Sequence, residues 1–173
     1  MEAFKGIAAI PTCYGPHLFR SRTEARWGIF LHRAGYRFDY EAEGLALPTG
    51  WYLPDFWVHS LSTIVEVKPG GKCPCGSISE PSAPPEPPPP EIRRALDVVR
   101  ASPEVSSVLV TYGDPYCIWE DRTAINVTME GGAPVQHFHD LGPLSGLFES
   151  AAAYDFAVEA RRARFEHGET PVW

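Results

Sequence analysis

Residues 50–68 read GWYLPDFWVHSLSTIVEVK. The aromatic and β-branched side chains of this stretch predict two β-strands joined by a tight turn. If residues 60–61 form that turn, Trp57 of the first strand pairs with Ile64 of the second. Side chains alternate between the two faces of such strands, so this pairing also predicts which residues share a face.

Three charged residues lie in these two strands. The same register pairs Asp55 with Glu66, with Cβ atoms roughly 5 Å apart, and it puts Lys68 on the face that carries Glu66. Two opposed carboxylates repel each other. A divalent cation between them removes the conflict, because Mg²⁺ binds one or two carboxylates together with water and phosphate oxygens. Lys68 would then reach a phosphate or the attacking water, so the three residues predict a phosphodiester-cleaving site.

These residues resemble the signature of the PD-(D/E)XK (restriction-endonuclease-like) nuclease superfamily. The resemblance consists of Pro54-Asp55, followed after a gap by Glu66-Val67-Lys68, with SRTEARW at residues 21–27 upstream. The whole pattern is similar to small phage nucleases and to transposon-end-cutting endonucleases, and it covers about residues 20 to 112.

The resemblance implies a Mg²⁺- or Mn²⁺-dependent deoxyribonuclease that leaves a 5′-phosphate. Asp55 and Glu66 would hold the metal ion, with the backbone carbonyl of Val67 as a further oxygen ligand. Lys68 would orient or deprotonate the attacking water. Glu24, as the glutamate of the first helix in that family, would assist with the metal or the water, which makes it the fourth expected catalytic residue.

Glu24 also has a purely structural interpretation. Ser21 fits a helix N-cap, and Glu24 three residues later completes a capping box for a helix that runs to about Ala34. The capping role and the role at a metal site do not exclude each other, and both stay open.

The elements that follow predict an α/β fold with a restriction-endonuclease-like core of helix, three-stranded antiparallel meander, helix and strand. The second helix is expected at residues 91–101 and the next strand at residues 105–111, parallel to the strand that carries Glu66. Further strands are expected at residues 116–119 and 123–129. We expect a single domain over residues 1–173, with a long C-terminal helix at residues 145–168.

Residues 69–90 are rich in proline, with seven prolines between Pro81 and Pro90. Such a segment favours polyproline II geometry and does not form a packed core. It is expected to be a flexible insertion, although its position directly after Lys68 would also let it touch DNA or a partner.

Composition limits the classes of function. The net charge of −7 argues against strong nonspecific binding of nucleic acid. Cations exceed acidic residues over residues 1–38, and the arginines expected to contact DNA are Arg20, Arg22 and Arg26, with modest and salt-sensitive affinity. No membrane span or signal peptide is expected, and the protein is placed in the cytoplasm, which is the host's if a phage encodes it.

Two other groups of residues raise the question of a metal site. Cys73-Pro74-Cys75 lacks the second cysteine pair of a convincing zinc site, and free thiols on a loop are the preferred interpretation. His137, His139 and Asp140 have strand-like spacing, but an exposed turn or satisfied side chains are preferred to a metal site.

Two other classes of function stay open. In the first, the chain is a catalytically silent module on the same fold that binds nucleic acid or inhibits a partner. In the second, it is a nuclease subunit of a transposition or packaging assembly. A homodimer or a larger nucleoprotein assembly is equally open.

Overall fold

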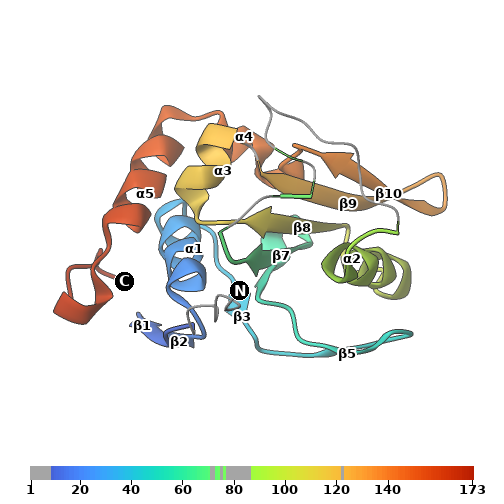
Figure 1. Cartoon of the computed structure of the whole chain (residues 1–173), viewed down its shortest axis with the longest axis horizontal. Helices are drawn as coiled ribbons and strands as arrows, with labels where there is room; N and C mark the ends of the chain where they lie inside the picture. Colours follow the sequence, from blue (N-terminus) through green and yellow to red (C-terminus); the bar gives the residue numbers. More distant parts are fainter. Residues whose placement is uncertain (1–8, 71–72, 75, 77–86, 122) are drawn as a thin grey trace, which may run out of the picture.

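A six-stranded mixed sheet forms the centre of the computed structural model, which describes residues 9–70, 73–74, 76, 87–121 and 123–173 (Figure 1). The strand order is β10-β9-β8-β7-β6-β3, in which only β7 and β8 are parallel neighbours. The strands are β3 (Asp39–Tyr40), β6 (Phe56–Val58), β7 (Thr63–Lys68), β8 (Ser107–Tyr112), β9 (Ala124–Glu130) and β10 (Ala133–Phe138). The predicted mixed α/β class is therefore confirmed.

The pairing of β6 with β7 has the register predicted from the sequence. Trp57 lies opposite Ile64, and Phe56 lies opposite Val65. The connection differs from the expected two-residue turn, because it is a 3₁₀ turn, η1 (His59–Leu61), followed by Ser62 in the left-handed conformation at φ 48°. The pairing of residues 57 and 64 is nevertheless the predicted one.

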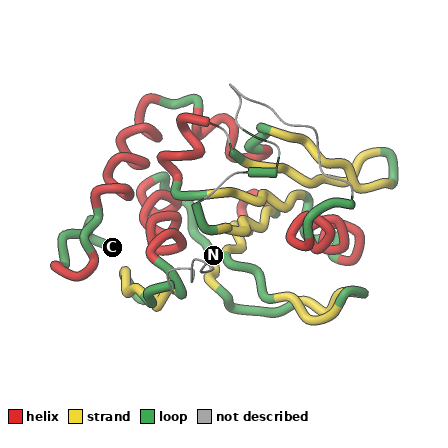
Figure 2. The backbone as a smooth tube through the Cα atoms, viewed as in Figure 1, coloured by secondary structure: helices red, strands yellow, loops and turns green. Residues whose placement is uncertain are grey.

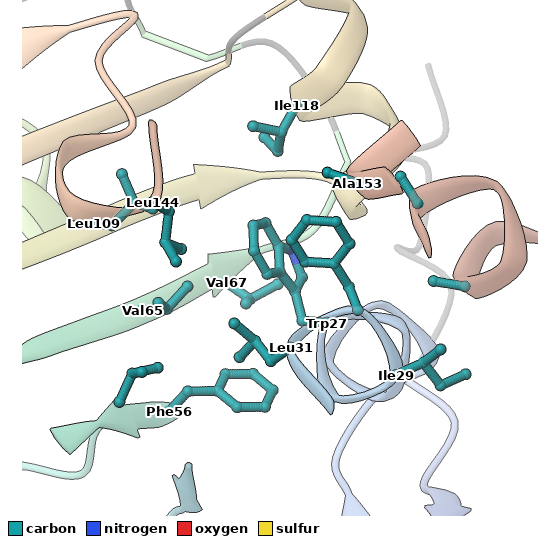
Figure 3. Close-up of a cluster of buried hydrophobic side chains, with 14 of the residues drawn as sticks. Trp27, Ile29, Leu31, Phe56, Val65, Val67, Leu109, Ile118, Leu144 and Ala153 are labelled. Atoms are coloured by element: carbon teal, nitrogen blue, oxygen red, sulfur yellow. The ribbon is translucent and has the colours of Figure 1, made fainter. Parts of the chain in front are cut away.

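Two hydrophobic cores cover the two faces of the sheet. On one face Val65 and Val67 of β7 pack with Trp27 and Leu31 of α1 (Arg22–Arg33), as Figure 3 shows. Helix α5 (Ala151–Arg162) also packs on α1 on this side. On the other face Ile64 packs against α2 (Pro90–Ala101). Because strand side chains alternate, Glu66 and Lys68 share the α2 face with Ile64.

The two long helices near the sheet begin and end close to where the sequence predicts. Ser21 caps α1, accepting a hydrogen bond from the backbone N–H of Glu24, and α1 ends before Ala34. Helix α2 begins one residue before the predicted start, with Pro90 in its first turn, where a missing N–H costs nothing. It connects β7 to the parallel strand β8, which was the expected crossover. Most of the proline-rich segment lies outside the described residues.

Two hairpins stand apart from the central sheet, as the strands in Figure 2 show: β1 (Thr12–Tyr14) with β2 (His17–Phe19), and β4 (Leu45–Leu47) with β5 (Gly50–Tyr52). The β4–β5 hairpin lies between β3 and β6 in the chain, and β4 contacts α2. The single strand expected over residues 50–58 is thus two strands, which separate at Leu53–Asp55, where Pro54 cannot donate a ladder hydrogen bond.

Two predictions for the C-terminal half are wrong. Residues 116–119, expected as a strand, lie in helix α3 (Pro115–Asp121). The side chain of Asp114 accepts a hydrogen bond from the backbone N–H of Cys117 and so caps this helix, with Pro115 in the first turn.

The prediction of a single helix over residues 145–168 is also wrong. The segment contains α4 (Ser145–Phe148), α5 and the 3₁₀ helix η3 (Phe165–His167), after the short η2 (Gly142–Leu144). The break occurs because Ser150 acts as an N-cap and accepts a hydrogen bond from the backbone N–H of Ala153. Within the described residues, no helix combines the length and the apolar character that a membrane span requires.

Candidate active site

Asp55 lies directly before β6, where the chain arrives from the β4–β5 hairpin. Only 3% of the residue is exposed. The backbone N–H of Val67 donates a hydrogen bond to Oδ2 at 2.8 Å, and Nη2 of Arg20 donates to Oδ1 at 2.8 Å. The β6–β7 ladder ends at the pair Phe56–Val65, so Asp55 lies just beyond it, with its carboxylate bonded to the backbone of Val67 on the neighbouring strand.

Glu66 lies in the middle of β7 and is 6% exposed. The hydroxyl of Tyr52 on β5 donates a hydrogen bond to Oε2 at 2.6 Å. Nζ of Lys68 donates to Oε1 at 2.5 Å, in agreement with the prediction that Glu66 and Lys68 share a face. Both oxygens of Glu66 are thus held by side chains, one from its own strand and one from the β4–β5 hairpin.

The two carboxylates influence each other electrostatically. Burial and the negative charge of Glu66 raise the pKa of Asp55 from 3.8 to about 7. The hydrogen bond from Val67 and the charge of Lys68 act in the opposite direction, while Glu24 raises the value further. Burial, followed by the charge of Glu66, also raises the pKa of Tyr52, which keeps its hydroxyl protonated as a donor.

Glu24 lies in the first turn of α1, where two hydroxyl groups hold its carboxylate. The hydroxyl of Ser21 donates to Oε1 at 2.7 Å, and the hydroxyl of Tyr40 donates to Oε2. Tyr40 also accepts a hydrogen bond from the backbone N–H of Arg20, whose guanidinium bonds Asp55. Glu24 is therefore linked to Asp55 through Tyr40 and Arg20. Ser21 is confirmed as the N-cap, but the Glu24 carboxylate bonds the Ser21 hydroxyl in place of the backbone N–H that a full capping box uses, and its role at a metal ion stays a prediction.

Each of the three arginines expected to contact DNA forms an ion pair. Arg20 pairs with Glu41 at 2.6 Å as well as with Asp55. Arg22 pairs with Glu166, and Arg26 pairs with Asp114 at 3.3 Å; the full set of partners is thus Glu41, Asp55, Glu166 and Asp114. A phosphate would have to compete with these carboxylates, so DNA contact by the three arginines stays a prediction.

The oxygen atoms of the site suit a hard divalent cation as ligands. Asp55 and Glu66 bring two carboxylates close together in a buried place, and like charges there are costly without a cation. The N–H of Val67 points toward Asp55, and in a strand the carbonyl of the same residue points to the same edge. The described residues contain no group of three or more His, Cys, Asp or Glu side chains arranged around an ion, so a metal here would take two carboxylates, this carbonyl and water.

The structure describes part of the two other groups of residues that were considered as metal sites. Cys73 is disulfide-bonded, so the prediction of a free thiol there is wrong, and a disulfide sulfur offers no thiolate for zinc. Cys75 lies outside the described residues. Nε2 of His137 pairs with Glu130 at 2.7 Å, and Asp140 accepts a hydrogen bond from Asn126, so these two side chains have partners, in agreement with the preferred interpretation.

The comparisons with known proteins add no relative: no protein-family model matches the chain, and no curated protein matches it.

Two tyrosines belong to the site although sequence reasoning assigned them no role. Tyr52 and Tyr40 each donate a hydrogen bond to one of the acidic residues, Glu66 and Glu24. A signal existed, because a tyrosine in a half-buried strand brings a hydroxyl that needs a partner. Which carboxylate that partner is depends on the fold and not on the spacing.

Proposed function

We propose that the chain is a metal-dependent nuclease that hydrolyses phosphodiester bonds of DNA. The observation that supports this most is that Asp55, just before β6, lies near Glu66 and Lys68 in the C-terminal half of β7. Both carboxylates are buried, Lys68 is hydrogen-bonded to Glu66, and Asp55 has a pKa raised to about 7 by burial and by Glu66. A sheet that served stability alone gains nothing from opposing two buried acids.

The order of elements supports a restriction-endonuclease-like core as the finer description of the fold. Helix α1 is followed by β3, β6 and β7, which are consecutive antiparallel neighbours in the sheet, and then by α2 and the parallel strand β8. This matches the expected order of helix, meander, helix and strand, with the β4–β5 hairpin as an insertion within the meander.

The site would hold Mg²⁺ or Mn²⁺ through Asp55, Glu66 and the carbonyl of Val67, with Glu24 as an assisting acid. Such an ion acidifies bound water and neutralises charge on the phosphate. The residues of the chain do the positioning. Tyr52 fixes the orientation of the Glu66 carboxylate, and the N–H of Val67 fixes that of Asp55.

Lys68 is the residue that would act on water. Its side chain is 26% exposed, and one of its ammonium hydrogens bonds Glu66. The remaining donors can hold a phosphate oxygen or the attacking water. In the reaction a water oxygen forms a new bond to phosphorus and gives its proton to a base, the bond from phosphorus to the leaving oxygen breaks, and the leaving oxygen takes up a proton from water to become a hydroxyl.

A second candidate function is a nucleic-acid-binding or inhibitory module without turnover. It is favoured by the net charge of −7 and by the ion pairs that engage Arg20, Arg22 and Arg26. Calorimetric titration with Mn²⁺ separates the two candidates. A nuclease binds the ion in a manner that requires Asp55, and a silent module does not.

The direct test of the proposal is cleavage of labelled DNA with Mg²⁺ or Mn²⁺ and with chelator. Wild-type protein should cut only with metal, and Asp55→Asn should abolish cutting. Asp140→Asn is the matched control, because Asp140 is a partly buried aspartate that bonds Asn126 on the β9 side of the sheet, outside the proposed site. Equal cutting by wild-type protein and Asp55→Asn would overturn the proposal.

A further inference from the structure

Arg20 bonds the carboxylate that the proposed function assigns to a metal ion. Its Nη2 donates a hydrogen bond to Oδ1 of Asp55 at 2.8 Å, and its Nε pairs with Glu41 at 2.6 Å. The second oxygen of Asp55, Oδ2, accepts a hydrogen bond from the backbone N–H of Val67 on the neighbouring strand. Oδ1 is therefore the oxygen at which a metal ion and the guanidinium compete, because two cations in contact with one oxygen repel each other.

Glu41 offers Arg20 a second partner in a fixed position. The backbone of Glu41 lies in the left-handed region at φ 46°, which costs free energy for a residue with a side chain, and such strain clusters at functional sites. Its N–H donates a hydrogen bond to the backbone carbonyl of Asp55 at 3.1 Å, so the two residues are held side by side. The guanidinium can thus leave Asp55 while it still bonds Glu41.

The acids around Asp55 outnumber the cations that bond them. Four carboxylates act on one another electrostatically, those of Glu24, Glu41, Asp55 and Glu66. Among the described residues, the side-chain cations in ion pairs with this group are Arg20 and Lys68. Four carboxylates against two cations leave a net charge of −2 when all are ionised, and one divalent cation balances that charge.

The side chain of Arg20 can move although its backbone is anchored. The backbone N–H donates to the hydroxyl of Tyr40 at 2.9 Å, directly before the N-cap of α1. The side chain is 59% exposed, so the guanidinium can turn from Asp55 toward solvent without opening the core. Its planar array of donors matches the oxygens of a phosphate group, which makes it a suitable partner for a DNA strand at the site.

We propose that Arg20 exchanges partners at the site: a divalent cation displaces its guanidinium from Asp55, and the released guanidinium binds a phosphate group of the DNA strand. This inference rests on the proposed nuclease function and goes beyond it by naming a phosphate-binding residue and the event that makes it available. Binding of the ion and binding of the strand then strengthen each other, because both draw on the same exchange.

The first test is calorimetric titration with Mn²⁺ in the absence of DNA, at pH 8, above the pKa of Asp55. Arg20→Gln should bind Mn²⁺ about 2- to 5-fold more tightly than wild-type protein, because the ion no longer has to break an exposed ion pair. Arg20→Lys keeps a cation in this place and should bind within about 2-fold of wild type. A residue that only positioned Asp55 would give the opposite sign, since its loss would weaken the metal site.

The second test is binding of fluorescein-labelled DNA, measured by fluorescence anisotropy in Ca²⁺ and in chelator. In Ca²⁺, Arg20→Gln should weaken binding about 10-fold or more, because a charge-assisted hydrogen bond to phosphate is lost. In chelator the same substitution should change binding by less than about 2-fold, since the guanidinium of wild-type protein is then bonded to Asp55.

Arg33→Gln is the matched control, because Arg33 also forms an exposed ion pair, with Glu159 at 2.9 Å, at the opposite end of α1. Its affinities for Mn²⁺ and for DNA should equal those of wild type. Mn²⁺ binding by Arg20→Gln that is no tighter than that of wild type refutes the displacement. An equal loss of DNA affinity in Ca²⁺ and in chelator, or no loss in Ca²⁺, refutes the exchange.

The cleavage assay separates this failure from failure of the proposed function. Metal-dependent cutting that requires Asp55, together with an affinity for Mn²⁺ that is unchanged or lowered in Arg20→Gln, overturns the exchange and leaves the nuclease intact. A wild-type protein that binds no Mn²⁺ and cuts no DNA overturns both.

Discussion

The substitution Asp55→Asn should stabilise the metal-free protein, and the gain should grow with pH. In the folded state the pKa of Asp55 is about 7, against 3.8 for the ordinary group. The folded protein therefore binds more protons than the unfolded chain between these two values, and its stability falls as the pH rises through that range. Asparagine has no such proton to lose.

The magnitude follows from the same two values. The interval from 3.8 to about 7, at about 1.4 kcal/mol for each pH unit, corresponds to about 4 kcal/mol at a pH above both. About 3 kcal/mol of this arises between pH 5 and pH 8, because part of the interval lies below pH 5. The ion pair between Asp55 and the exposed Arg20 is lost as well; because the pair exists only where Asp55 is ionised, its loss takes back about 1 kcal/mol or less, and only toward the upper end of this pH range.

The assay is urea unfolding of wild-type protein and Asp55→Asn in chelator at several pH values. The difference between the two free energies of unfolding cancels the titrating groups that do not interact with Asp55. It should favour the variant by about 2–3 kcal/mol more at pH 8 than at pH 5. A difference that does not depend on pH, or that favours wild type increasingly as the pH rises, would refute the assignment of a raised pKa to Asp55.

Three further outcomes are expected. Tyr52→Phe should lower the free energy of unfolding in urea by about 1–3 kcal/mol, because it leaves one oxygen of the buried Glu66 without a donor. Tyr112→Phe, which removes a longer hydrogen bond to the less buried Glu91, should cost less. An equal cost for both variants would argue against a stronger contribution from the Tyr52–Glu66 bond. Ser21→Ala should cost about 1 kcal/mol through loss of the α1 cap, seen as a lower urea midpoint with an unchanged slope, and an unchanged midpoint would contradict the capping assignment. Mn²⁺ at 100 times its dissociation constant should raise the stability of wild-type protein by about 2.7 kcal/mol and should leave Asp55→Asn unchanged in a thermal-shift measurement; an equal rise in both would place the ion elsewhere.

The register of the central hairpin could be predicted from the sequence because it depends on local alternation. Because side chains alternate between faces, shifting the pairing by one residue would move the apolar side chains to the wrong face, so the pairing of Trp57 with Ile64 is strongly favoured. That pairing brings Asp55 toward Glu66. The start of α1 could be predicted for a similar reason, since the N-cap Ser21 accepts a hydrogen bond from the backbone N–H of Glu24 only three residues later.

The errors occur where a local signal was weak or was outweighed by another. Residues 116–119 are rich in aromatic and β-branched side chains, which favour a strand, yet Asp114 and Pro115 provide a cap and a first turn for a helix. At the C-terminal end the helical pattern continues through Ser150, although this serine starts a new helix.

Other features of the candidate site depend on contacts between distant segments. The separation of β5 from β6 places Tyr52 against Glu66, and the loop before α1 places Arg20 against Asp55. Neither contact has a fixed sequence spacing. For the same reason the ion pairs of Arg22 and Arg26 with acidic partners far along the chain could not be read from local charge counts.

The most direct test of the central claim is the rate of metal-dependent cleavage of labelled DNA by wild-type protein and by Lys68→Ala. Lys68 is the most exposed of the four proposed catalytic residues, and it is bonded to Glu66. We predict that wild-type protein cuts with Mg²⁺ or Mn²⁺ and not with chelator, and that Lys68→Ala remains folded but does not cut. Undiminished cutting by Lys68→Ala, or no cutting by wild-type protein with either metal, would contradict the proposed nuclease site.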